Sequence, residues 1–186
     1  MKVTHTPLPG LLVLEPKTFG DHRGYFFEGF NEKRYQEVGI NCHFLQDNMS
    51  RSHAGVLRGL HFQTTKMQDK LVTVTHGVVF DVAVDIRLGS PTFGQWFGLI
   101  LSDENHKQLF VPKGFAHGFY VLSPVADFHY KCSDYYAPEY EAGIIWNDPE
   151  LDIKWPLDKD PVMSSKDQVF TRLSKFNPEL LPSYQN

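Results

Sequence analysis

His61 is the first side chain in this 186-residue sequence whose setting suggests acid–base chemistry, and it ends the run Val56-Leu57-Arg58-Gly59-Leu60-His61. Imidazole transfers protons readily near neutral pH. In a strand, residues two apart share a face, so His61 would point away from Arg58. A bulge at Gly59 would bring both side chains to one cavity. Taken alone, a histidine in a strand is more often structural, so a catalytic role for His61 needs support from other residues.

Three further side chains could work with a histidine base, and each also has a purely structural explanation. Lys70 opens the next apolar segment, where a lysine is either solvated or holds positive charge beside a substrate. Tyr130 lies on the apolar face of its segment, as a core aromatic or a proton donor would. Asp167 follows Ser164 by three residues, which resembles a helix cap, although its carboxylate could instead hold His61 in one tautomer.

The segment Pro112-Lys113-Gly114-Phe115-Ala116-His117-Gly118 matches P-x-G-x-x-H, the second motif of the cupin superfamily, in which Pro and Gly shape a turn that directs the His inward. Metal-binding cupins combine this His with an H-x-H pair and a Glu. Here Gly59 stands two residues before His61 and Gln63 two residues after it, so the H-x-H pair is missing. We therefore expect a site without metal, which also disfavours a metal-dependent cupin oxygenase.

Two polar clusters interrupt otherwise apolar surroundings: Asp21-His22-Arg23-Gly24 followed by Glu28, and Gln46-Asp47-Asn48. Arg23 and Arg58 are candidates to bind a diphosphate, because a guanidinium group matches phosphate oxygens. The stretch Tyr135-Tyr136-Ala137-Pro138 offers rings that could stack on a base, with a surface turn as the alternative.

The elements that must position these residues are mostly strands. Pro and Gly punctuate the chain, and aromatic and β-branched residues alternate with polar ones between them. Many short strands at this spacing predict an all-β sandwich or closed barrel with a few short helices. The expected strands span residues 25–30, 43–49, 56–63, 70–75, 78–86, 92–101, 108–111, 118–122 and 126–132. A short helix is expected over residues 32–38, capped by Asn31 and ended by Gly39, and another turn of helix opens at Ser164.

Composition and charge narrow the class of protein. A hydrophobic fraction of 41% and an aromatic fraction of 14% support a packed core. The net charge of −4 argues against a general nucleic-acid surface, and two cysteines, Cys42 and Cys132, are too few for a disulfide framework. No apolar run suits a membrane helix, and the N-terminus lacks a signal-peptide pattern. We expect one cytoplasmic domain over residues 1–186, with no nucleic-acid or membrane partner, whose segment from about residue 160 packs over the barrel.

Several motifs follow one another in a specific order along the chain. The first half contains Asp21-x-Arg23-Gly24, Gln46-x-Asn48-x-Ser50, Gly55-Val56-Leu57-Arg58-Gly59-Leu60-His61, Lys70-Leu71-Val72 and Asp81-Val82-Ala83-Val84-Asp85-Ile86-Arg87. The second half contains Ser90-Pro91-Thr92-Phe93-Gly94, Pro112-x-Gly114-Phe115-Ala116-His117-Gly118-Phe119, Trp146-Asn147-Asp148-Pro149 and Ser165-Lys166-Asp167. Over about residues 3–175 this order closely resembles the dTDP-4-dehydrorhamnose 3,5-epimerase family. The resemblance implies a cupin-type jelly roll, a homodimer, a dTDP-sugar substrate and no metal or organic cofactor.

The resemblance also implies a role for each candidate. His61 corresponds to the base, Asp167 to its dyad partner, Tyr130 to the proton donor across the sugar, and Lys70 to the cation beside the 4-keto oxygen. Tyr136 corresponds to the ring that stacks with thymine. The remaining substrate-contact positions are Arg23, Glu28, Gln46, Asp47, Asn48, Arg58, His117, Glu141 and Lys166, together with Lys70 itself.

These residue types suit the reaction that the resemblance implies, inversion of C3 and C5 of dTDP-4-dehydro-6-deoxy-D-glucose in dTDP-L-rhamnose biosynthesis. Loss of either proton gives an enolate on the C4 oxygen, where Lys70 would stabilise the charge. Inversion then needs Tyr130 opposite His61, since a lone base would return the proton to the same face. Two alternatives stay open: an epimerase restricted to one carbon, and a non-catalytic nucleotide-sugar-binding cupin.

Overall fold

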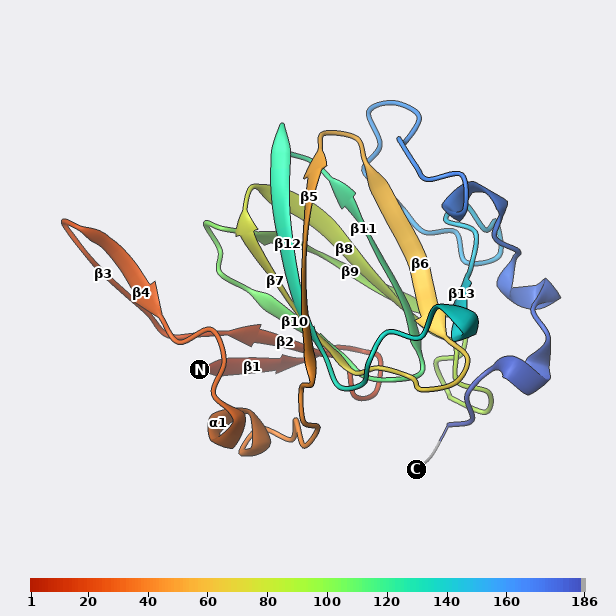
Figure 1. The fold of residues 1–186 in the computed structure, drawn as a ribbon, viewed down its shortest axis with the longest axis horizontal. Helices are drawn as coiled ribbons and strands as arrows, with labels where there is room; N and C mark the ends of the chain where they lie inside the picture. Colours follow the sequence, from red (N-terminus) through yellow and green to blue (C-terminus); the bar gives the residue numbers. More distant parts are fainter. Residues whose placement is uncertain (185–186) are drawn as a thin grey trace.

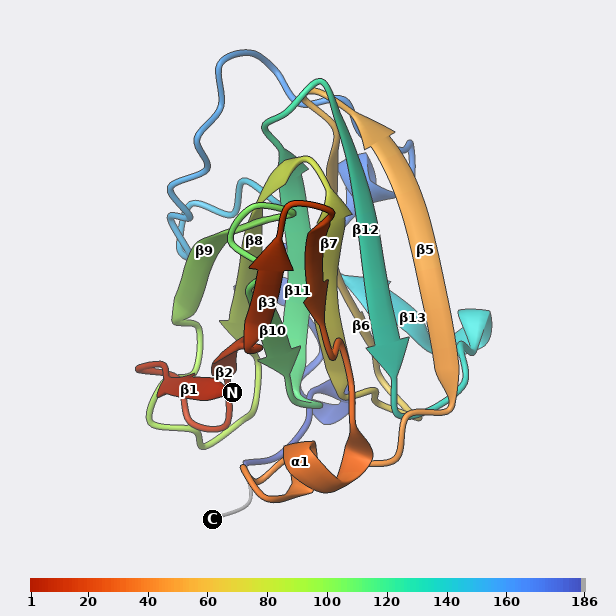
Figure 2. The ribbon, with the colours of Figure 1, turned by 90° about the vertical axis from the view of Figure 1, so that its left-hand side faces the viewer.

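Two antiparallel β-sheets packed face to face form the body of the protein (Figures 1 and 2), in a computed structural model that describes residues 1–184. From β5 to β8 and from β9 to β13, successive strands alternate between the sheets, as in a jelly roll. The predicted all-β fold is confirmed. One sheet contains, in order, β1 (Lys2–His5), β2 (Leu12–Glu15), β10 (Gln108–Val111), β7 (Lys70–His76), β12 (Val125–Cys132) and β5 (Gln46–His53). The other contains β13 (Glu141–Gly143), β6 (Leu57–Gln63), β11 (Phe115–Val121), β8 (Val78–Asp85) and β9 (Trp96–Ser102).

Strand β8 lies between β11 and β9 and is buried on both faces. Its odd-numbered side chains, such as Val79 and Ala83, join the core between the sheets, whereas even-numbered ones such as Val82 pack outward. The polar face expected for this strand, which carries Asp81 and Asp85, is therefore the inner one, and both carboxylates are fully buried. Buried carboxylates need hydrogen-bond partners, and those of Asp81 and Asp85 are directed to the space between the sheets.

Further layers pack against part of the outer face of each sheet. The C-terminal segment lies over the five-stranded sheet, where Leu173 and Leu181 join an apolar cluster (Figure 1). Its short 3-10 helices are η2 (Asp167–Val169), η3 (Leu173–Lys175) and η4 (Pro178–Leu180), and η1 (Pro138–Tyr140) precedes β13. Helix α1 (Glu32–Gln36) packs Tyr35 against the six-stranded sheet, and Asn31 caps it by accepting a hydrogen bond from the Arg34 N–H. Within residues 1–184, no helix is long and apolar enough to cross a membrane.

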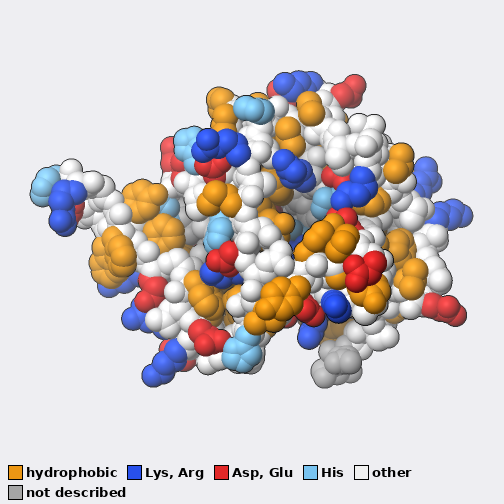
Figure 3. Space-filling view, in the orientation of Figure 1, with side chains coloured by type: hydrophobic (Ala, Val, Ile, Leu, Met, Phe, Trp, Pro, Cys, Tyr) orange, Lys and Arg blue, Asp and Glu red, His pale blue; other side chains and the backbone are white. Residues whose placement is uncertain are grey.

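A separate hairpin, β3 (Thr18–Asp21) and β4 (Gly24–Phe27), extends away from the barrel at the left of Figure 1. Its aromatic side chains are open to solvent: Phe19 is 54% exposed, Tyr25 56% and Phe26 68%. Hydrophobic side chains line this arm in Figure 3. Large exposed apolar surface on a projecting element is typical of an interaction surface.

Strand positions largely follow the prediction, and the differences have local causes. The strand expected over residues 92–101 begins only at Trp96, because Ser90 and Thr92 form a turn by donating hydrogen bonds to the Asp85 carboxylate. The strands expected at 25–30, 43–49 and 118–122 are instead found at Gly24–Phe27, Gln46–His53 and Phe115–Val121. The sequence does not predict β1, β2, β3 or β13, which are too short to show a clear alternation.

Candidate active site

A cavity of about 320 Å³ opens between the two sheets and gathers most of the predicted site residues. One wall comes from β5, β7 and β12, and the other from β6, β11 and β13. The predicted residues that line it are Gln46, Asn48, Arg58, His61, Lys70, His117, Tyr130, Tyr136 and Glu141. Apolar side chains such as Phe119 and Phe128 complete the wall, so the polar groups lie in a partly dry setting.

A bulge in β6 brings Arg58 and His61 to this cavity together. His61 pairs with His117 of β11, but Arg58 pairs with Phe119, so three steps along β6 match two along β11. The extra residue reverses the alternation between Arg58 and His61, as the sequence predicts for a bulge at Gly59. Gly59 has φ +116°, a conformation that side chains rarely adopt.

His61 and Asp167 form a hydrogen-bonded pair across 106 residues of sequence. The His61 Nε2 lies 2.9 Å from the Asp167 Oδ1, and the Gly59 N–H donates to the other carboxylate oxygen at 3.3 Å. Burial of Asp167 acts to raise the pKa of its carboxyl, but the hydrogen bonds from His61 and Gly59 outweigh this effect and the pKa is lowered. Asp167 is therefore an anion that accepts the Nε2 proton and leaves Nδ1 as the free ring nitrogen.

The capping interaction expected at Ser164 is also present. The Ser164 hydroxyl accepts a hydrogen bond from the Asp167 N–H at 3.1 Å. Ser164 thus caps the turn with its side chain while the Asp167 carboxylate is turned toward His61. The two interpretations of Asp167 are compatible, because they concern different atoms of the same residue.

Tyr130 and Lys70 belong to the sheet opposite His61. Tyr130 packs against the core through Phe128, and burial raises the pKa of its phenol, with smaller contributions from Cys132 and Glu141. The phenol is therefore protonated and able to donate. Burial lowers the pKa of Lys70, and Cys132, Asp81 and Glu141 oppose this effect. Lys70 pairs directly with Cys132 across the β7–β12 ladder.

His117 forms a second histidine–aspartate pair that the sequence does not predict. Its Nε2 lies 2.8 Å from the Asp81 Oδ1, and the side chains are 7% and 0% exposed. His117 and His61 are neighbours across the β6–β11 ladder. The signal for Asp81 in the sequence is a carboxylate alternating with apolar residues on β8, which alone does not reveal that its face is interior.

Glu141 links two other predicted residues at the mouth of the cavity. It accepts hydrogen bonds from the Tyr136 hydroxyl at 2.8 Å and from the Lys166 ammonium at 2.7 Å. Burial acts to raise the pKa of Glu141, but these two hydrogen bonds outweigh it and the pKa is lowered. The Gln46 side-chain Oε1 accepts a hydrogen bond from the Tyr136 backbone N–H at 2.9 Å, which ties the backbone of Tyr136 to β5.

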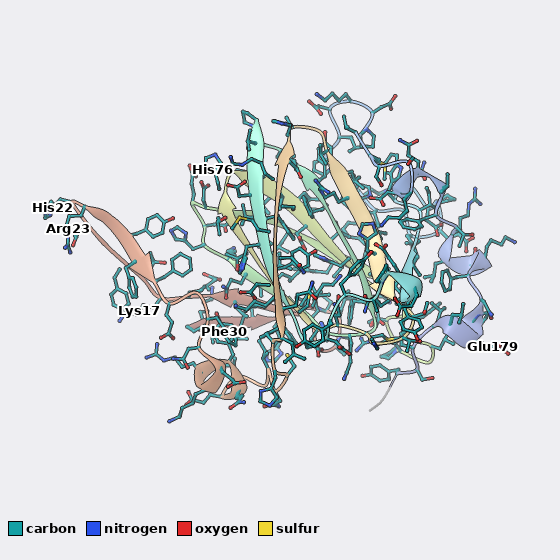
Figure 4. The ribbon with its side chains drawn as sticks, in the orientation of Figure 1. Lys17, His22, Arg23, Phe30, His76 and Glu179 are labelled. Atoms are coloured by element: carbon teal, nitrogen blue, oxygen red, sulfur yellow. The ribbon has the colours of Figure 1, made fainter. Side chains whose placement is uncertain are left out.

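Lys166 and Asp167 do not line the cavity but bond to Glu141 and His61, which do, whereas three other predicted residues do neither within one chain. Arg23 lies at the tip of the β3–β4 hairpin (Figure 4) and pairs with Asp21 at 2.6 Å. Glu28 pairs with Arg34 at 3.1 Å. Asp47 lies between two inward-facing residues of β5, so alternation turns it outward, where it pairs with Lys131 at 2.9 Å. Across residues 1–184, moreover, no three His, Cys, Asp or Glu side chains gather as a metal site would require.

Comparison with known proteins agrees with this fold. A family model described as dTDP-4-dehydrorhamnose 3,5-epimerase matches residues 5–175. The dTDP-4-dehydrorhamnose 3,5-epimerase of Pseudomonas aeruginosa is 56% identical over 90% of this chain and 93% of its own. A crystal structure of the Legionella pneumophila dTDP-6-deoxy-D-glucose-3,5-epimerase with dTDP-4-keto-L-rhamnose has a TM-score of 0.98 and 57% identity, covering 100% of this chain and 99% of that one.

A relative with a narrower activity has the same fold. The 3'-monoepimerase of Streptomyces bikiniensis, in complex with dTDP-quinovose, has a TM-score of 0.88 and 33% identity, covering 96% of this chain and 92% of that one. The two facing antiparallel sheets of this chain form a cupin-type jelly roll, as expected. With the family model matched along most of its length, this chain belongs to the dTDP-4-dehydrorhamnose 3,5-epimerase family.

Proposed function

We propose that this protein is an isomerase that inverts C3 and C5 of dTDP-4-dehydro-6-deoxy-D-glucose, giving dTDP-4-dehydro-L-rhamnose for dTDP-L-rhamnose biosynthesis. The observation that carries the proposal is the placement of the His61–Asp167 pair on one sheet and Tyr130 on the other, with the cavity between them. A base and an acid on opposite walls are what inversion of a carbon centre requires. The proposed steps use side chains of this chain alone, without an organic cofactor.

His61 removes the proton from C5 or C3 through Nδ1, while Asp167 stabilises the imidazolium that forms. The electrons of the broken C–H bond pass into the sugar, and the C4 carbonyl becomes an enolate. Lys70 places positive charge at that oxygen, and His117 contributes a second polar group from the opposite wall. Electrostatic stabilisation of a developing oxyanion is usually the largest contribution to such catalysis.

Tyr130 then protonates the same carbon from the other side. The raised pKa of its phenol keeps the proton in place until the enolate withdraws it. Each inversion leaves His61 with one more proton and Tyr130 with one fewer, so both return to their starting forms by exchange with solvent. The same two groups serve C3 and C5 because both carbons flank the C4 carbonyl.

The nucleotide is held at the mouth of the cavity, away from the reacting carbons. Tyr136 supplies the face on which thymine stacks, and Glu141 fixes that ring together with Lys166. Arg58 and Lys166 suit the diphosphate, and Gln46 and Asn48 suit polar groups of the nucleotide. The Legionella relative, bound to dTDP-4-keto-L-rhamnose, supports a dTDP-sugar as ligand. Remote binding energy of this kind orients the sugar for both steps.

Arg23 and Glu28 fit the substrate only if the chain acts as a homodimer. The hairpin that carries Arg23 projects from its own barrel with exposed aromatic rings, so we propose that it docks on a second copy and brings both residues to that copy's cavity. Burying these rings would favour association. Asp47, whose side chain is turned outward, would contact substrate through its backbone.

An epimerase acting at one carbon is the second candidate, because the fold is shared with a 3'-monoepimerase. Incubation with dTDP-4-dehydro-6-deoxy-D-glucose in D₂O, with deuterium located by NMR, separates the two. Incorporation at C3 and C5 supports the double activity, and incorporation at one carbon supports the restricted one. If the dTDP-sugar binds but no deuterium enters at C3 or C5, the protein is a non-catalytic nucleotide-sugar-binding cupin.

A further inference from the structure

Asp81 is a buried carboxylate to which the proposed reaction gives no step. It lies on the inner face of β8 with no exposed surface, and its Oδ1 is 2.8 Å from the His117 Nε2. Its Oδ2 is the one buried side-chain nitrogen or oxygen in residues 1–184 that has no hydrogen-bond partner. A buried carboxylate oxygen without a hydrogen-bond partner is costly.

Asp85 shows what a structural carboxylate on this strand looks like. It lies four residues further along the same face and is equally buried. Both of its oxygens accept hydrogen bonds: one from Arg87, and the other from Arg87, Ser90 and Thr92. Asp81 has a single partner, on the cavity wall. The fold therefore satisfies both carboxylate oxygens of Asp85 with hydrogen bonds, but it leaves one oxygen of Asp81 without a partner beside the cavity.

Lys70 is the group that needs such an anion. It lies on the cavity wall, where its ladder partners are Val111 of β10 and Cys132 of β12. Burial lowers its pKa, which favours loss of the charge that the enolate requires. The ionisable groups that oppose this loss are Cys132 from β12, Asp81 from β8 and Glu141 from β13. The other ionisable residues on the wall are Arg58, His61, His117, Tyr130 and Tyr136.

Two of the three opposing groups are poorly suited to support Lys70. Burial raises the pKa of the Cys132 thiol, so at neutral pH it carries no charge. The Glu141 carboxylate already binds the Lys166 ammonium and the Tyr136 hydroxyl. Asp81 has no cation bound to its second oxygen, and it lies in the low-dielectric core, where charges act over a longer range.

We propose that Asp81 is a positioning residue, the buried counter-anion that holds Lys70 in its ammonium form beside the reacting carbonyl. One carboxylate then serves two residues of the cavity, His117 through a hydrogen bond and Lys70 through its charge. The purpose of this arrangement rests on the proposed function, because a charged Lys70 matters only where an oxyanion develops. The arrangement itself is a property of the free protein and is measured without substrate.

The test measures the protonation of Lys70 directly. In protein labelled with ¹³C at the lysine side chains, the Lys70 NMR signal is identified by its absence in Lys70→Arg, and its titration midpoint is read from pH 6 upward. Asp81→Asn keeps the shape of the side chain and removes its charge. We expect the Lys70 midpoint to fall by about one pH unit, a tenfold change in the ionisation constant. The alkaline limit of deuterium incorporation should move down by a similar amount.

Asp85→Asn is the matched control, since it removes a buried charge from the same face of the same strand. It should leave the Lys70 midpoint in place. An unchanged Lys70 midpoint in folded Asp81→Asn would overturn the proposal. So would a loss of deuterium incorporation that is equal at every pH and leaves its alkaline limit in place. If Asp81→Asn does not fold, Asp81→Ser carries the same test. A shifted midpoint in a protein without epimerase activity would contradict the proposed function and leave this inference standing.

Discussion

Gly59 and Gly118 lie against each other where β6 pairs with β11, so closely that a Cβ on Gly59 would be 2.6 Å from the Gly118 Cα. A Cβ on Gly118 would in turn lie 2.6 Å from the Arg58 carbonyl oxygen. No side chain fits between the strands at this point, which is where β6 takes in its extra residue. The two glycines thereby bring Arg58 and His61 to the same cavity.

Replacing Gly59 with Ala should disturb both stability and the site. The alanine would be strained at φ +116° and its Cβ would meet backbone atoms, which cannot move away cheaply. We expect a loss of roughly 3 kcal/mol in the free energy of unfolding, measured with urea. Gly89→Ala is the control, since φ is +81° but nothing lies within 4 Å of the new Cβ. Equal losses in the two variants would mean that the close approach of the strands is unimportant.

Much of this site can be predicted from sequence where local pattern and chemistry agree. The alternation in β8 predicts a strand with one apolar and one polar face, and the glycine between Arg58 and His61 predicts a bulge, because both depend on neighbours in the chain. The pairing of His61 with Asp167 does not follow from local pattern. The two are 106 residues apart, and only resemblance to the family brings them together before the structure does.

Other features depend on packing that no local pattern reveals. Asp81 looks like a solvent-facing residue of an amphipathic strand until the second sheet covers that face. Strand β13, at Glu141–Gly143, is too short to alternate and exists because it pairs with β6. The role of Arg23 depends on a second chain, since the hairpin holds it away from its own barrel (Figure 4).

His61→Ala should remove proton abstraction and leave nucleotide binding largely intact. The proposed contacts to thymine and diphosphate come from other residues, whereas the base is lost. Deuterium incorporation at C3 and C5 should fall by roughly 10²- to 10⁴-fold, the contribution of a positioned base. Calorimetry with dTDP checks binding, and His53→Ala, at an exposed position of β5, should behave as wild type. Exchange that survives in His61→Ala would refute the assignment of the base.

Tyr130→Phe should separate proton removal from inversion. The ring remains and the core contact with Phe128 is kept, but the donor is gone. Deuterium exchange from the His61 side should continue at a reduced rate, while net formation of the inverted sugar should fall about 10²-fold or more. Tyr135→Phe, at a ring 61% exposed, is the control. If both rates fell equally, Tyr130 would not be the donor.

Asp167 should contribute to stability in a pH-dependent way. Its pKa is lowered in the folded protein, so its contribution is fully present above its ordinary pKa and is lost as pH falls through the folded value. The stability advantage of wild type over Asp167→Asn, measured by urea unfolding, should therefore be largest near neutral pH and shrink below about pH 4. Asp152→Asn, whose side chain is 68% exposed, should show little such dependence. If the stability advantage of wild type over Asp167→Asn stayed constant with pH, the ionisation of Asp167 would not contribute to stability.

If the protein acts as the proposed homodimer, two inactive variants should restore activity to each other. If Arg23 acts in the partner's cavity, a mixed dimer of Arg23→Ala and His61→Ala subunits contains one intact site, formed by His61 of the first subunit and the hairpin of the second. Co-expressed variants should then recover roughly a quarter of wild-type activity, since random pairing makes half the dimers mixed. Each variant alone should be weakly active or inactive. If Arg23 acted within its own chain, the mixture would show no recovery. Lys33→Ala paired with His61→Ala is the control: because Lys33 lies on the exposed surface of α1, Lys33→Ala should be fully active when it is expressed alone as a homodimer.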